Sequence, residues 1–158
     1  SFTEVGATTA LFFLVSGVGQ AASGFIVDHL GARRVLLTGI ALFALAAVTL
    51  GMANSYPMLM AAAAIAGLGN SVFHPADFTL LNRNVCASRL GHAFSMHGLC
   101  GNLGWALAPV FLSTMAVALG WRAAAFGAAG VALLALAIFF LRRATLRETA
   151  LTPVTSSA

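Results

Sequence analysis

Five long apolar runs dominate the sequence and restrict what the chain can fold into. Almost no charged side chain interrupts them, and they extend over residues 5–27, 35–53, 58–81, 93–119 and 123–141. A helix needs about 20 mainly apolar residues to cross a bilayer core about 30 Å thick. Barrel strands are shorter, about 10 residues, and alternate polar with apolar side chains. Alanine and leucine are common in the runs and favour helix, so the sequence predicts an all-α membrane protein with five transmembrane helices.

The charge content excludes several other classes of protein. Charged residues make up 8% of the 158-residue chain, against about 25% in an ordinary soluble domain. The net charge of +4 comes from eight arginines and four acidic residues. The arginines stand in short clusters between the apolar runs, which is typical of membrane-flanking charge and not of a nucleic-acid-binding surface. We therefore expect the lipid bilayer, and no nucleic acid, as a partner. Two cysteines indicate no disulfide framework.

The arginines also predict the orientation of the bundle. One side of the predicted spans carries seven of them, namely Arg33, Arg34, Arg83, Arg89, Arg142, Arg143 and Arg147. Arg122 stands alone on the other side. Because arginine is enriched in cytoplasmic loops, the side with seven is expected in the cytoplasm and Ser1 outside. Residues 1–143 would form the five-span bundle, and residues 144–158 a cytoplasmic tail or a truncated central loop. No signal sequence precedes the first span, so we expect a fragment of a longer protein.

Polar and small residues distinguish the spans from one another. The runs 35–53 and 123–141 are almost purely apolar, and we expect them to support the bundle from its lipid-facing side. Gln20 belongs to a polar stripe on the first run. In the fourth run small residues recur every three or four positions, a spacing that predicts close helix packing; these residues are Gly98, Gly101, Gly104 and Ala108, followed by Pro109. The packing partner is either this bundle or a missing half of the protein.

A few polar side chains inside the spans are candidates for a solute path. They are Gln20, Asn70, His74, His97 and Asn102, because polar residues in membrane helices usually face a cavity or a partner. Pro75 removes a backbone hydrogen bond and can kink the third run. His97 lies well inside a span, and its reference pKa of about 6.5 suits proton exchange. The alternative for His97 is a hydrogen-bonded packing residue.

A short motif joins the first two runs on the arginine-rich side. Residues 24–34 have the form G-x-x-x-D-x-x-G-x-R-R. Gly24 permits close helix approach, and the Asp28 carboxylate can interact with a helix N-terminus or with an arginine. Gly31 allows a tight turn. Arg33 and Arg34 would hold the loop in the cytoplasm.

This motif resembles the cytoplasmic loop between the second and third helices of a six-helix half in the major facilitator superfamily. His29 and Ala32 stand where the family usually has basic residues. With this loop as anchor, the five runs match helices two to six of the family's first half. Residues 97–109 resemble its glycine-rich fifth helix. Residues 70–75 resemble the fourth helix of fosmidomycin-resistance-type members, and the resemblance covers residues 1–143.

The resemblance implies a secondary transporter of a small solute that works by alternating access and is proton-coupled, in the bacterial inner membrane and without a cofactor. Its partners would be the missing first helix and the second six-helix half of the same chain. The loop motif would belong to the cytoplasmic gate. Asp77 would be the acidic partner of Arg33 or Arg34, since both lie on the same side.

Two other functions remain open at the level of the sequence. One is a structural or assembly subunit of a membrane complex. The other is an intramembrane enzyme or metal protein that collects His74, Asp77, His92 and His97. No zinc-protease motif, paired cysteines or nucleophilic serine motif accompanies these residues, so we expect no catalytic or metal-binding residues.

Overall fold

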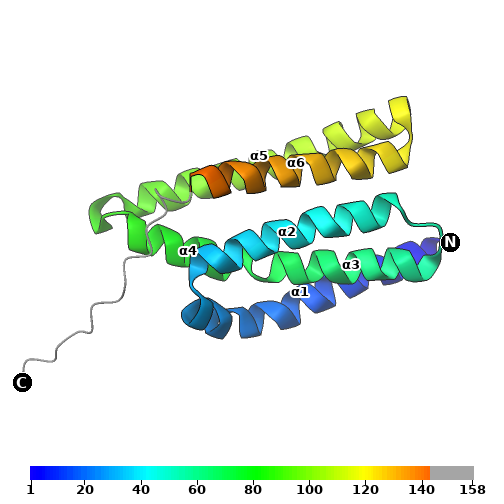
Figure 1. Cartoon of the computed structure of the whole chain (residues 1–158). Helices are drawn as coiled ribbons and strands as arrows, with labels where there is room; N and C mark the ends of the chain where they lie inside the picture. The colour runs from blue at the N-terminus through cyan, green and yellow to red at the C-terminus, as the bar shows by residue number, and fades with distance from the viewer. Residues whose placement is uncertain (143–158) are drawn as a thin grey trace, which may run out of the picture.

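The computed structural model describes residues 1–142, which form helices and short turns (Figure 1). The helices are α1 Phe2–Leu30, α2 Ala32–Gly51, α3 Tyr56–Ser71, α4 Phe73–Asn84, the 3₁₀ helix η1 Ala87–Arg89, α5 Leu90–Leu119 and α6 Trp121–Leu141. Five stretches are long and apolar enough to cross a membrane, with α3 and α4 together making the third. The five transmembrane helices predicted from the sequence are confirmed. The predicted tail, residues 144–158, lies outside the described residues.

Single glycines form two of the helix connections. Gly31 separates α1 from α2 with φ of 85°, and Gly120 separates α5 from α6 with φ of 90°. A positive φ is the backbone region that glycine adopts at little cost and other residues avoid. Each glycine also ends the helix before it, since the Gly31 N–H donates to the carbonyl of Val27 and the Gly120 N–H to that of Ala116. The helix α1 continues to Leu30, three residues beyond its predicted run, and α5 ends at Leu119, as predicted.

The third span is broken near its middle, between α3 and α4. Val72 lies at the break with φ of −97° and ψ of −13°. Pro75 stands three residues later and has no N–H to donate, and its ring clashes with the carbonyl of the residue four positions earlier. That residue is Ser71, the last of α3. The kink expected from Pro75 therefore appears one turn before the proline itself.

The helices pack in an open row, in which α2 lies between α3 and α6, α1 packs on α3, and α5 packs on α6 (Figure 1). Residues 35–53, which we expect to support the bundle from its lipid-facing side, belong to a helix that packs on both sides within the described chain, and their lipid-facing role stays a prediction. Eight residues of α2 are buried, because this helix has a neighbour on each side. No residue of α5 is buried against the rest of residues 1–142.

Two features occupy the end of the bundle where α1 meets α2. The hydrophobic core lies there and joins the end of α1, the start of α2 and α4 through Val27, Ala32, Val35, Leu36, Ile40 and Ala76. The antiparallel order of the helices also gathers arginines at this end (Figure 1), namely Arg33, Arg34, Arg83, Arg89 and Arg142. Arg122 lies at the opposite end. The described arginines are thus separated as the sequence predicts.

Candidate functional site

An ion pair between α4 and α5 connects two residues from different spans. The Nε2 atom of His97 lies 3.6 Å from the Oδ2 atom of Asp77, and the side chains are 40% and 20% exposed. Charged groups inside a membrane span are costly unless they are paired or face water. Both residues are candidates from the sequence, which predicts an arginine of the loop as the partner of Asp77. The contact with His97 was not predicted, because charge placement alone does not show which helices lie side by side.

A cavity of about 440 Å³ opens beside this pair. Its lining comes from α4 and α5 and consists of His74, Phe78, Phe94, His97, Gly98, Gly101, Asn102 and Trp105. Phe78 is the centre of the ring contacts: its centroid lies 5.8 Å from that of His74, 5.3 Å from that of Phe94 and 6.4 Å from that of His97. Three of the five predicted solute-path residues, His74, His97 and Asn102, are therefore brought to one place.

The other two predicted solute-path residues meet elsewhere, between α1 and α3. The amide nitrogen of Asn70 donates to the hydroxyl of Ser16 over 2.7 Å, and that of Gln20 donates to the same oxygen over 3.4 Å. Ser16 is 3% exposed. The structure thus makes Gln20 and Asn70 part of a polar contact that joins two helices, and Ser16 is the residue that holds the contact together.

The loop motif has the turn that its glycine predicts, but its charges are spread out. Asp28 is exposed at the end of α1 and makes no ion pair within residues 1–142. A β-carbon placed on Gly24 would meet nothing within 4 Å, so this glycine is not at a close helix contact in the described part of the chain. Arg34 is exposed and Arg33 half-buried. The pairing of Asp77 with Arg33 or Arg34 stays a prediction.

The glycines of α5 have no neighbour in the described part of the chain. A β-carbon placed on Gly98, Gly101 or Gly104 would meet nothing within 4 Å, and Pro109 is exposed on the same helix. These glycines therefore do not pack against α1, α2, α3 or α6. Packing of this face against a missing half of the protein stays a prediction.

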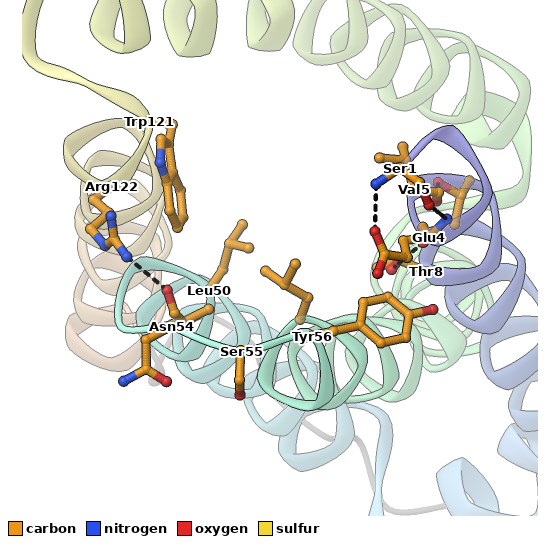
Figure 2. A pocket seen from close by; sticks show the side chains of 13 residues that line it. Ser1, Glu4, Val5, Thr8, Leu50, Asn54, Ser55, Tyr56, Trp121 and Arg122 are labelled. Atoms are coloured by element: carbon orange, nitrogen blue, oxygen red, sulfur yellow. Dashed lines mark hydrogen bonds and ion pairs between the residues drawn. The ribbon is translucent and has the colours of Figure 1, made fainter.

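A second hollow, of about 570 Å³, lies at the end opposite the loop motif. Figure 2 shows Glu4 and Thr8 of α1 facing Trp121 and Arg122 of α6 across it. The Arg122 guanidinium lies 4.4 Å from the Trp121 ring centroid and donates to the carbonyl of Ala53 over 3.0 Å. Arg122 therefore ties the start of α6 to the chain that leaves α2. Within residues 1–142, no three His, Cys, Asp or Glu side chains are grouped as metal ligands.

The family model described as "Major Facilitator Superfamily" matches residues 1–156. The chain belongs to the major facilitator superfamily. Together with the five membrane-length helices, membership of this superfamily makes it a multi-pass membrane protein of the cell membrane.

Named members of the superfamily share moderate identity with the chain. The Probable L-galactonate transporter of Escherichia coli is 27% identical over 77% of this chain and 27% of its own length. The Fosmidomycin resistance protein of E. coli is 30% identical over 73% of this chain and 28% of its own. The Probable 4-methylmuconolactone transporter of Cupriavidus pinatubonensis is 30% identical over 89% of this chain and 33% of its own. The chain thus spans about a third or less of these superfamily members.

Proposed function

We propose that the protein is part of a secondary active transporter that moves a small solute across the membrane by alternating access, with proton coupling through Asp77 and His97. The observation that carries the proposal is the ion pair between α4 and α5 at the edge of a cavity. Two relatives named as transporters support the general function. Because the relatives are bacterial, we expect the inner membrane.

The ion pair is suited to proton coupling because both partners can change charge. Protonation of the Asp77 carboxylate would remove the attraction to His97, and an imidazole with a reference pKa of about 6.5 exchanges protons near neutral pH. The ionisable side chains beside His97 are Asp77 and His74 on α4. The rest of its own helix contributes His92 and Cys100, η1 contributes Arg89, and α6 carries Arg122 at the far end. A change of charge at the pair would therefore act chiefly on the contact between α4 and α5.

The open face of α5 supports the proposal that further helices of the same protein complete the site. Within residues 1–142 this helix buries no residue, and apolar side chains such as Leu103 and Leu107 are more than half exposed. Small residues let helix backbones approach closely. We expect a first helix and a second six-helix half to pack on α5 around the cavity, and α5 to move against them during transport.

Uptake by the complete protein tests the proposal. Proteoliposomes with an imposed pH gradient should accumulate at least one of three solutes named in the relatives, L-galactonate, fosmidomycin or 4-methylmuconolactone, and a protonophore should remove the accumulation. Empty liposomes are the control. Movement that the protonophore leaves unchanged would contradict proton coupling. Absence of movement for these and other small solutes would favour a structural or assembly subunit.

A charge exchange tests the predicted gate pair. If Asp77 pairs with Arg34 in one access state, the single variants Asp77→Arg and Arg34→Asp should each lose uptake, and the combined variant should recover part of it. The same exchange with Arg33 is the parallel case. Uptake assays on equal amounts of folded protein make the measurement. A double variant that never exceeds the singles would exclude the pairing.

A further inference from the structure

The cavity between α4 and α5 has a floor formed by two glycines of α5, which is open within residues 1–142. Phe94, Gly98, Gly101 and Trp105 follow one another at intervals of three or four residues, which places them on one face of α5. The two glycines present no side chain, and nothing described lies within 4 Å of where a β-carbon would be. The aromatic side chains stand before and after this floor, and Trp105 is 77% exposed.

The walls of the cavity are aromatic and lie at steep angles to one another. The Phe78 and Phe94 rings meet at 82°, and the Phe78 and His97 rings at 75°. Edge-to-face arrangements of this kind leave ring faces available for a further flat group. A bulky saturated body would not gain these face contacts.

The polar groups that line the cavity favour an anion over a cation. They are the imidazoles of His74 and His97 and the amide of Asn102, and the described lining contains no acidic side chain. The nearest carboxylate, that of Asp77, is already paired with His97. An imidazole N–H donates to a carboxylate, and the hydrogen bond is charge-assisted when the imidazole is protonated, whereas the lining offers a bound ammonium group no carboxylate.

We infer that this cavity binds a flat, unsaturated or aromatic carboxylate, with the ring against Phe94 and the carboxylate at His97, one helical turn away. The inference rests on the proposed function, since it names the class of solute that the transporter carries. In this arrangement the carboxylate of the solute competes with Asp77 for the His97 imidazole. Binding of the solute thus leaves the Asp77 carboxylate free to take up a proton. Solute binding and proton binding are therefore coupled at Asp77.

Equilibrium binding to the complete protein tests the inference separately from transport. The protein in lipid nanodiscs is titrated in a calorimeter with benzoate, with cyclohexanecarboxylate and with benzylammonium, and empty nanodiscs correct for partition into lipid. Benzoate should bind about fivefold more tightly than its saturated analogue, the size expected for one good aromatic contact. Benzylammonium should show no saturable binding.

Substitutions test whether benzoate binds in this cavity. Phe94→Leu should remove the preference for benzoate over cyclohexanecarboxylate, and Gly101→Leu should weaken both by filling the floor. His97→Gln should remove the dependence of benzoate affinity on pH between 5 and 8, the range in which histidine titrates. Phe25→Leu is the matched control, because Phe25 is 74% exposed on α1 and does not line the cavity; it should bind benzoate as the parent does.

The outcomes separate the inferred binding site from the proposed transport function. Equal affinity for benzoate and cyclohexanecarboxylate, tighter binding of benzylammonium, or an equal loss in Phe94→Leu and Phe25→Leu would overturn the inference. Proton-driven uptake of another solute without benzoate binding would overturn it and leave the proposed function standing. Benzoate binding with the expected pattern in a protein that moves no solute would support the binding site and contradict transport.

Discussion

Replacing Asp77 with asparagine should reduce the accumulation of solute driven by a pH gradient to the level reached without one. Asparagine keeps the size and the hydrogen-bonding oxygen of the side chain but cannot bind a proton. Its contact with His97, 3.6 Å away in the parent, loses its charge. The solute should still cross the membrane down its own gradient, because the cavity and its lining are left in place.

The size of the effect follows from the energy of the gradient. One pH unit across the membrane corresponds to about 1.4 kcal/mol per proton, which is about tenfold accumulation if one proton accompanies each solute. The variant should therefore fall from about tenfold to about onefold in such a gradient. Downhill counterflow of labelled solute in the same proteoliposomes shows that the variant is folded and active.

Glu4→Gln is the matched control for this substitution. Glu4 is a second carboxylate, exposed on α1 at the opposite end of the bundle, and the same change of acid to amide should leave the accumulation unaltered. His97→Gln should flatten the pH profile of uptake without abolishing downhill movement. Full accumulation by the Asp77 variant, or an equal loss in the Glu4 variant, would show that the proton is carried elsewhere.

The sequence predicts the helices of this protein well because hydrophobic length and glycine turns are local properties. The five spans follow from runs of apolar residues, and the turn at Gly31 follows from the one residue type that adopts a positive φ at little cost. The break at Val72 follows less directly. Pro75 indicates that the helix is disturbed, but its ring clashes with a carbonyl one turn earlier. The sequence therefore predicts a break in this span, and the structure shows that the break is at Val72.

The contacts between helices could not be predicted in the same way. Asp77 and His97 are 20 positions apart on different spans, and charge placement alone suggested an arginine for Asp77. Gln20 and Asn70 were selected as polar residues facing a path, whereas both donate to Ser16. A polar residue in a span signals that a partner exists, but the partner is decided by how the helices are ordered around α2.

The spacing of glycines likewise does not predict which helices come into contact. The fourth run carries the more regular pattern of small residues, and in the structure its glycines face open space. The close contacts occur at other glycines, for which the sequence predicts no packing role. Gly67 lies against the backbone of α1, and Gly39 and Gly69 bring α2 and α3 together. A small residue permits close packing; it does not show which helix comes close.

Gly67→Ala should therefore destabilise the protein strongly for so small a change. A β-carbon at this position would lie 2.7 Å from the carbonyl oxygen of Phe12 and 3.0 Å from the β-carbon of Val15. The first atom belongs to the backbone of α1 and cannot rotate away, so α1 and α3 must separate. Overpacking of this kind costs about 1–3 kcal/mol, which exceeds the gain of up to about 1 kcal/mol from replacing glycine by alanine in a helix. Thermal unfolding of the purified complete protein in one detergent measures the loss.

Gly130→Ala is the control for this prediction, and Gly101→Ala tests whether a further helix packs on α5. Gly130 lies on α6 with nothing within 4 Å of a β-carbon, so its substitution should leave the unfolding temperature unchanged or raise it. An equal fall for Gly67→Ala and Gly130→Ala would mean that the contact with α1 is not what makes the first costly. Gly101 is equally open in residues 1–142. If a further helix of the complete protein packs on α5, Gly101→Ala should lower the unfolding temperature as Gly67→Ala does; if that face stays open, it should behave as Gly130→Ala does.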